Sequence, residues 1–423
     1  MFFKKKQKLV EQPLYYWEEK SYMLIIPKSA DDNILKDSIE RINKIKDLEI
    51  SENNYSIKDN AMHLKIIYKN INYEVGLYLG EISVPEYYFN NNSLFTKKEK
   101  EDLLKATKSI TVFMKFSEDY KLSYHLQLKL ANALVPDMLG LMDESAEKIF
   151  SGKWVRMTAK SNVLPNPKDM FSVQAVVGEN EKVWLHTHGL CRCGISELEI
   201  LESDSNNYQN HYNLISTYAL YLLDKREKYE NLTEGAYIGV LINNQPVVVT
   251  SIPWTEALKN YKKLKLGGIS DRQGGHNSKS NVIFLYKSEE DENNKIISKI
   301  NVFDKFWGEN PLFFISDEET NRMKSLAIER FNYVKEAFKD KTNEIIIKIG
   351  IPLAEKGKFE HIWFELLEIK NNKFKAKLTQ EPYDIENMHP GYIAWFSIED
   401  ITDWLIYTKD FSVNPDNAYL LEK

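Results

Sequence analysis

Residues 184–199 hold the densest group of side chains able to do chemistry, including His186, His188, Cys191 and Cys193. Two of the eight histidines and both cysteines of the chain lie here. Side chains on a β-strand alternate between its faces, so His186 and His188 should share one face, and the cysteines should share a face if the chain stays extended. Imidazole nitrogen and thiolate sulfur are good zinc ligands, and four of them suit a tetrahedral site.

A four-ligand zinc site is therefore one interpretation of this segment. Each ligand pair is separated by a single residue, whereas structural zinc sites use wider spacings on separate elements, which the metal then ties together. The alternative is the end of a strand at which the histidines hydrogen-bond to neighbours. The cysteines would then be small, half-buried apolar residues.

The pattern of His186, His188, Ser196 and Glu199 resembles the JAMM metalloprotease motif. That resemblance implies a metal-dependent hydrolase in which the two histidines and an acidic residue bind zinc and the serine supports the tetrahedral intermediate. The sequence departs from the motif at Gly189, where the family has proline, and at Glu199, where it has aspartate. The family's upstream glutamate, which activates the metal-bound water, has no counterpart that the sequence identifies.

The charged residues of the segment allow a third interpretation. Arg192, Glu197 and Glu199 could form an intramolecular charge network, or contact an anion or a peptide near a loop. Gly189 and Gly194 suit the tight backbone turns that such an arrangement needs. We favour a structural role for these charges. If the segment binds a ligand instead, the candidate binding residues are His186, His188, Arg192, Glu197 and Glu199.

Other chemical signals are sparse. Residues 267–280 are rich in glycine and polar residues and include His276, and this loop is long enough to bind a ligand. No Gly-Lys-Ser/Thr sequence closes a phosphate-binding loop, and no Gly-x-Ser-x-Gly nucleophile elbow occurs. The sequence therefore contains no complete catalytic constellation.

The pattern of apolar residues predicts an α+β protein with mixed or antiparallel sheets and packed helices, plus a small β-rich α+β domain at the C-terminus. The motif should lie on a strand at 183–188. Hairpins are expected at 63–68 with 73–78 and at 237–242 with 247–252, and helices at 121–142, broken or kinked by Pro136, and at 211–224. Residues 154–157 read as a strand and 399–407 as a helix. We expect an N-terminal subdomain at 1–115, a central one at 116–315 and a C-terminal domain at 320–423.

Composition limits the classes of function. The chain has 423 residues, of which 43% are hydrophobic and 28% charged, as expected for a folded multidomain protein. A net charge of −6 opposes general binding to nucleic acid. No apolar run approaches the roughly 20 residues of a membrane span, and residues 9–13 do not continue the basic start as a secretion signal would. The two cysteines are too close for an unstrained disulfide, so we expect reduced thiols in the cytoplasm.

The sequence also resembles known families. His-Thr-His-Gly-Leu at 186–190 and Glu-Leu-Glu-Ile at 197–200 resemble the hallmark of a bacterial domain of unknown function. Residues 361–365, 391–392 and 401–404 resemble the YegJ-like domain, which is also uncharacterised. The resemblance covers nearly the whole chain and implies two parts, at about 1–315 and 320–423. It implies no particular reaction.

These observations lead to two hypotheses. We expect a cytoplasmic bacterial binding or interaction protein without catalytic activity or cofactor, regulatory or immunity-like, whose partner is a protein. The alternative is a zinc-dependent, JAMM-like hydrolase that uses His186, His188 and Glu199, with Ser196 assisting.

Overall fold

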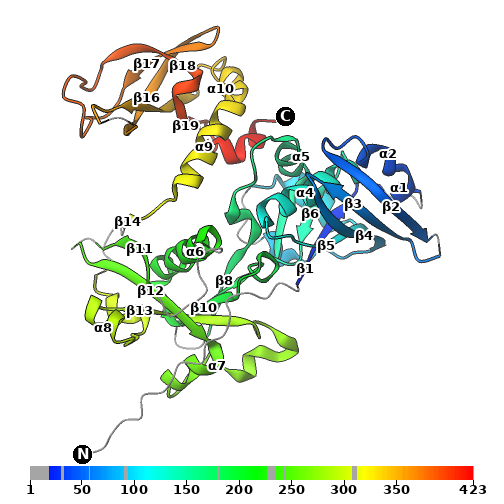
Figure 1. Cartoon of the computed structure of the whole chain (residues 1–423). Helices are drawn as coiled ribbons and strands as arrows, with labels where there is room; N and C mark the ends of the chain where they lie inside the picture. Colours follow the sequence, from blue (N-terminus) through cyan, green and yellow to red (C-terminus); the bar gives the residue numbers. More distant parts are fainter. Residues whose placement is uncertain are drawn as a thin grey trace, which may run out of the picture. The chain divides into compact units, whose positions relative to one another are not determined.

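The computed structural model describes residues 19–29, 33–56, 58–89, 94–178, 181–225, 235–241, 244–306, 312–355 and 357–422. The expected absence of a secretion signal concerns residues outside these ranges. The chain divides into two compact units (Figure 1). The first takes in the described residues of 1–91, 98–150 and 167–314, and the second those of 92–97, 151–166 and 315–423.

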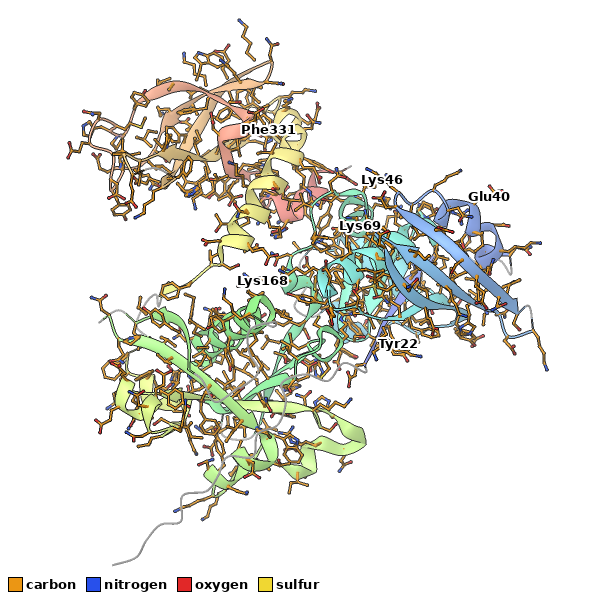
Figure 2. The ribbon with its side chains drawn as sticks, in the orientation of Figure 1. Tyr22, Glu40, Lys46, Lys69, Lys168 and Phe331 are labelled. Atoms are coloured by element: carbon orange, nitrogen blue, oxygen red, sulfur yellow. The ribbon has the colours of Figure 1, made fainter. Side chains whose placement is uncertain are left out.

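The first unit begins with a seven-stranded antiparallel sheet, which we call sheet A. Its strands, in spatial order, are β2 (Leu48–Ser56), β3 (Ala61–Tyr68), β4 (Ile71–Glu81), β5 (Lys108–Lys115), β1 (Lys20–Ile26), β6 (Gly140–Asp143) and β7 (Lys148–Ser151). The associated helices are α1 (Ile34–Asp37), α2 (Ile39–Ile42), α3 (Lys97–Leu104) and α4 (Tyr120–Leu134). Tyr22 of β1, labelled in Figure 2, is 40% exposed, whereas its neighbours Ser21 and Met23 are buried, as strand alternation requires.

Helix α4 packs against sheet A, and particular residues determine where it begins and ends. Asp119 caps the start by accepting a hydrogen bond from the backbone N–H of Leu122 (2.9 Å). Gln127, on the buried side, donates to the carbonyls of Ser21 and Val112, on β1 and β5. The helix stops at Leu134, just before Pro136, which agrees with the predicted break at that proline, and residues 140–142 of the predicted helix at 121–142 lie in strand β6 instead.

A second seven-stranded sheet, sheet B, completes the first unit. Its order is β14 (Leu312–Phe313), β11 (Ala236–Val240), β12 (Pro246–Pro253), β13 (Ser280–Tyr286), β10 (Glu197–Asp204), β9 (Lys182–His188) and β8 (Ser172–Val177). Its helices are α6 (Tyr208–Lys225), α7 (Trp254–Ala257) and α8 (Glu289–Asn293). Only the pair β10–β13 is parallel among the described strand pairs of this sheet. Trp184, Leu201, Val282 and Phe284 form part of its apolar core.

The second unit contains a six-stranded antiparallel sheet, sheet C, together with helices. The strand order is β18 (Ile393–Ser397), β17 (Lys373–Leu378), β16 (Phe359–Lys370), β15 (Glu344–Pro352), β19 (Ile401–Tyr407) and β20 (Ser412–Val413). Its helices are α5 (Gly152–Lys160), α9 (Asp317–Glu329) and α10 (Phe331–Ala337). Trp404 of β19 is fully buried and donates its indole N–H to the carbonyl of Ala327 in α9 (3.0 Å). Phe331, labelled in Figure 2, packs 6.0 Å from the ring of Phe374, centroid to centroid.

The α+β class with mostly antiparallel sheets and a β-rich C-terminal region is as predicted. Two local predictions are wrong. Residues 154–157 lie in helix α5, because Ser151 caps its start by accepting from the N–H of Trp154 (3.1 Å). Residues 401–407 form strand β19, and the acidic signal before them belongs to a short 3-10 turn, η9 (Ile398–Asp400), capped by Ser397. No helix among the described residues is long and apolar enough to cross a membrane.

Candidate metal centre

Strand β9 holds two of the predicted site histidines side by side. It lies between β8 and β10, and His186 pairs with Gln174 on one side and Glu199 on the other. The imidazole rings of His186 and His188 are 5.0 Å apart, centroid to centroid, on the shared face that the two-residue period predicts. His186 is fully buried, and the side chain of His188 is 13% exposed.

A third histidine, His276, joins them from a distant part of the chain. It follows the 3-10 turns of η7 (Ile269–Gly275), and its ring lies 5.1 Å from that of His186 and 5.2 Å from that of His188. One potential ligand atom from each histidine lies within 4.8 Å of the other two. Three imidazoles from two elements therefore converge on one point.

The hydrogen bonding of these rings is incomplete. Both ring nitrogens of His186, and Nε2 of His188, are buried and make no hydrogen bond within the part of the chain that the structure describes. Leaving a buried polar atom without a partner costs about 1–3 kcal/mol, so native proteins rarely tolerate three in one place. A bound cation would satisfy the lone-pair nitrogen of such a ring, whereas the N–H nitrogen needs an acceptor.

Burial also keeps these imidazoles in the form that binds metals. It lowers the pKa of His186 to about 2, with smaller contributions from the neighbouring His188, His276 and Arg272. Burial likewise lowers the pKa of His188, although nearby Glu147 acts in the opposite direction. Both rings are therefore neutral at pH 7, and a neutral imidazole has a free lone pair for a metal ion.

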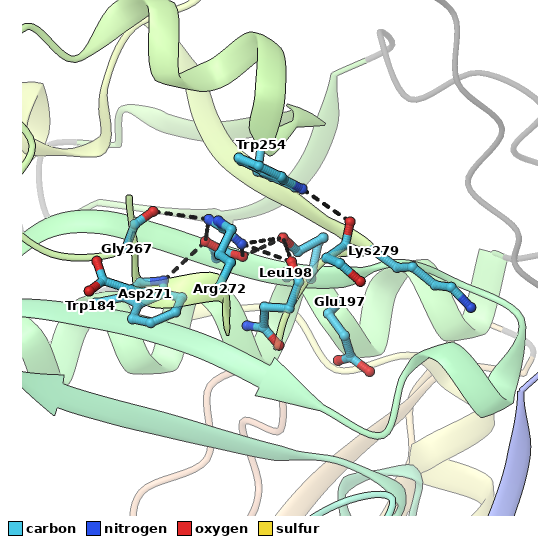
Figure 3. A network of polar contacts seen from close by, with 12 residues as sticks. Trp184, Glu197, Leu198, Trp254, Gly267, Asp271, Arg272 and Lys279 are labelled. Atoms are coloured by element: carbon cyan, nitrogen blue, oxygen red, sulfur yellow. Dashed lines mark hydrogen bonds and ion pairs between the residues drawn. The ribbon is translucent and has the colours of Figure 1, made fainter. Parts of the chain in front are cut away.

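The loop that carries His276 is held by a buried ion pair (Figure 3). The guanidinium of Arg272 donates to both carboxylate oxygens of Glu199 at 2.6 and 2.7 Å and to the carbonyl of Gly267 at 3.1 Å. It also stacks 4.3 Å from the ring centroid of Trp254. Glu199 accepts a further hydrogen bond from the indole N–H of Trp184 (3.0 Å), so its carboxylate serves as the anchor of this loop.

Glu197 organises the turn that follows β9. Its carboxylate accepts from the hydroxyl of Thr187 (2.6 Å) and from the backbone N–H groups of Gly189 (2.9 Å) and Cys191 (3.1 Å). Burial raises the pKa of Glu197, and these hydrogen bonds oppose that effect. Together they fix the direction in which the chain leaves His188.

Arg192 and Ser196 are buried at the same turn. Arg192 makes two 2.7 Å hydrogen bonds to Asp143 on β6, and it also donates to the hydroxyl of Ser21 (2.8 Å) and the carbonyl of Met170 (2.6 Å). Its guanidinium thereby connects sheet A with the turn after β9. Arg192 is thus part of an intramolecular charge network, but its acidic partner is Asp143 rather than Glu197 or Glu199, with which the sequence grouped it.

The two cysteines lie close in sequence but outside the histidine cluster. Both are buried, and neither forms a disulfide. The thiol of Cys191 lies 3.9 Å from the carbonyl of Lys279, and that of Cys193 lies 3.7 Å from the carbonyl of Gly189. Burial raises the pKa of Cys191 well above its ordinary value, which keeps it a thiol rather than the thiolate that binds zinc.

At Gly189, this turn has a backbone conformation that the proline of the JAMM motif could not adopt. The φ of this glycine, +107°, lies in a region that proline cannot reach, and its N–H donates to Glu197. A side chain there would also meet the carbonyl of Met170, since a Cβ would lie only 2.4 Å from that oxygen. Of the four residues in the JAMM resemblance, the cluster contains His186 and His188, while Glu199 binds Arg272.

Sequence analysis did not identify His276 as a site residue. The available signal was the glycine-rich loop itself, which is long enough to bind a ligand, together with the histidine at its end. No spacing rule joins His276 to the strand at 182–188, because the link depends on β10 and β13 being parallel neighbours.

Family models match most of the chain. A model described as a protein of unknown function (DUF4026), N-terminal, matches residues 21–165, and its C-terminal counterpart matches residues 173–284. A third, described as an uncharacterised protein conserved in bacteria (DUF2314), matches residues 313–414. These matches confirm the resemblance to uncharacterised bacterial families, whereas the motif at 186–200 as their hallmark and the YegJ-like assignment remain predictions. No curated protein and no solved structure matches the chain.

Proposed function

The chain matches the N-terminal and C-terminal DUF4026 models, whose descriptions give no function, and we propose a function from the site itself. The protein binds a divalent metal ion of the zinc class through His186, His188 and His276. The convergence of three imidazoles within 4.8 Å carries this proposal. The buried, unpartnered ring nitrogens of His186 support it, because a metal ion would bind the lone pair of one of them.

The ligand chemistry favours zinc over a hard cation. Imidazole nitrogen binds zinc at about 2.0–2.1 Å, whereas calcium and magnesium prefer oxygen ligands. A site with three histidine ligands leaves one position of a tetrahedral zinc ion for water or another small ligand. Cobalt, nickel and copper also bind imidazole, and which metal is taken up in the cell depends on its supply as well as on the site.

Hydrolysis is the second candidate function. Three protein ligands with an open fourth position are typical of catalytic zinc, which lowers the pKa of a bound water to about 7 and so makes it a nucleophile at neutral pH. In this hypothesis, Glu199 does not serve as the acidic ligand, since both of its carboxylate oxygens are paired with Arg272, and the assisting role of Ser196 stays a prediction. Binding of a protein partner, and a cytoplasmic location, remain predictions.

The test is the metal content of the protein, purified without a histidine tag and measured by plasma mass spectrometry after incubation with zinc and desalting. We expect about one zinc per chain in the wild type and little in His276→Ala, which removes a ligand on a loop rather than in the core. His63→Ala removes an exposed histidine of β3 and should retain the metal. Cys191→Ser/Cys193→Ser should also retain it. Absence of zinc from the wild type, or full occupancy in His276→Ala, would overturn the proposal.

A further inference from the structure

A turn of sheet A reaches the histidine cluster of sheet B. Glu147 lies between β6 and β7 with a φ of +49°, in the left-handed region that non-glycine residues seldom adopt. Its carboxylate oxygen Oε1 lies 3.7 Å from Nε2 of His188, and its side chain is 32% exposed. The other carboxylate oxygen accepts a hydrogen bond from Gln174, the residue that pairs with His186 across β8 and β9.

Buried contacts hold the β6–β7 turn against the end of β9. Asp143, at the end of β6, binds Arg192 and also accepts from the N–H of Ala146 (3.3 Å). Ala146 is fully buried beneath Gly189, so closely that a Cβ on Gly189 would lie 3.1 Å from that of Ala146. Glu147 is therefore placed beside His188 by buried contacts rather than by the freedom of an exposed loop.

Charge and hydrogen bonding give this carboxylate a role in a metal site. A divalent ion bound by three neutral imidazoles keeps its full charge of +2, and a carboxylate close by stabilises that charge where water is scarce. Metal-binding histidines nearly always donate their other ring N–H to a carboxylate, a carbonyl or water, which fixes the orientation of the ring. Nε2 of His188 is buried and has no hydrogen-bond partner among the described residues, and the carboxylate of Glu147 lies just beyond hydrogen-bonding distance.

We infer that Glu147 is the outer carboxylate of the metal site, a positioning residue that orients His188 from sheet A. This inference rests on the proposed metal binding. With Glu147 included, the site contains residues from the segments matched by both DUF4026 models. Glu147 lies in the N-terminal segment, and all three histidines lie in the C-terminal one. Metal binding then fastens the β6–β7 turn to the end of β9.

The test measures zinc affinity by competition with a chromogenic chelator in wild type, Glu147→Gln and Glu147→Ala. Loss of an outer-shell partner typically weakens metal binding by about 10–100-fold. We expect a loss in this range for Glu147→Ala and a smaller one for Glu147→Gln, which keeps an oxygen acceptor. Glu144→Gln is the matched control, because it neutralises an exposed carboxylate on the same turn and should leave the affinity within about threefold.

Two further readouts separate positioning from a general effect on folding. The visible absorption of the Co²⁺-substituted protein reports the geometry of the ligands, and it should change in Glu147→Ala but not in Glu144→Gln. The thermal midpoint of the metal-free protein should be nearly the same in all variants. Unchanged affinity and an unchanged Co²⁺ spectrum in Glu147→Ala would overturn the inference while leaving the three-histidine site intact. Reduced affinity with an unchanged spectrum and a lower metal-free midpoint would overturn it too, in favour of a purely structural role. If the wild type binds neither metal, the proposed function itself fails.

Discussion

Arg272 and Glu199 face each other as a two-bonded ion pair inside the protein, with side-chain exposures of 4% and 0%. The arginine belongs to the loop that carries His276, and the glutamate belongs to the strand beside His186. The pair thus fixes the distance between the third histidine and the other two.

Replacing Arg272 with alanine should destabilise the first unit and weaken zinc binding together. Removing one partner of a buried ion pair costs about 3–5 kcal/mol, because the remaining charge is left without compensation. For a unit of this size, we expect the thermal midpoint to fall by roughly 10 °C. Lys279→Ala is the control, since Lys279 and its partner Glu19 are 41% and 43% exposed and such pairs contribute little. Equal midpoints for Arg272→Ala and Lys279→Ala, measured by calorimetry, would contradict this prediction.

Replacing Gly189 with alanine should be far more damaging than a similar change at Gly274. Both glycines have positive φ, of +107° and +67°. Alanine at either position would lower the free energy of unfolding by about 1–2 kcal/mol, because its side chain strains that backbone conformation. Only at Gly189 would the new methyl group also meet backbone, 2.4 Å from the carbonyl oxygen of Met170, whereas Gly274 has no atom within 4 Å of the same position. Thermal unfolding of the two variants tests this. A similar loss of stability in both would show that the turn after β9 can relax.

Removing the metal should lower the stability of the wild type. A ligand that binds only the folded protein stabilises it by about 2.7 kcal/mol at a free concentration of 100 times its Kd. We therefore expect the thermal midpoint of the zinc-loaded protein to fall by several degrees when excess chelator is added. His276→Ala should show the same midpoint with and without chelator. A chelator-dependent shift of equal size in that variant would place the metal elsewhere.

Asp403 should make the second unit less stable as the pH rises from about 4 to 6. Burial raises the pKa of its carboxyl from 3.8 to about 6, and the hydrogen bond from the N–H of Trp404 only partly opposes this. In this pH range the folded protein binds more protons than the unfolded chain, so stability falls with rising pH, by at most about 3 kcal/mol for this group.

The variant Asp403→Asn tests this prediction, because it removes the charge but keeps an oxygen that can accept from Trp404. It should raise the thermal midpoint at pH 7.5 and have little effect at pH 4. Asp410→Asn neutralises an exposed carboxylate nearby and provides the control. A stabilisation of the same size at both pH values would mean that burial of the charge is not its cause.

The sequence predicted local features of the site well, because those features depend on local periodicity. The alternation of residues in β9 correctly placed His186 and His188 on one face, and the two hairpins of sheets A and B appear where turn residues separate apolar runs. Errors arose where a capping residue or pairing with a neighbouring strand outweighed the local pattern. Ser151 starts a helix through residues that read as a strand, and pairing with β15 makes a strand of residues that read as a helix.

The third histidine and Glu147 could not be predicted in the same way. Each reaches the cluster through contacts between residues far apart in the chain, namely the pairs Arg272–Glu199 and Arg192–Asp143. A single sequence shows that these residues are charged, but their pairing depends on how the strands of two sheets are ordered. The sequence suggested a charge network that includes Arg192, but the pairing of Arg192 with Asp143 and of Arg272 with Glu199 could not be predicted from the local pattern.

The contacts of Arg192 also bear on the order in which the protein can assemble during its synthesis. Its acceptors, on Ser21, Asp143 and Met170, all precede it in the chain, so they can already be in place when the ribosome releases the turn after β9. His276 leaves the ribosome much later, after β11 and β12. Nascent chains generally fold from the N-terminus onward. The growing polypeptide would therefore expose a pair of histidines on a finished strand before the residue that completes their cluster has been translated.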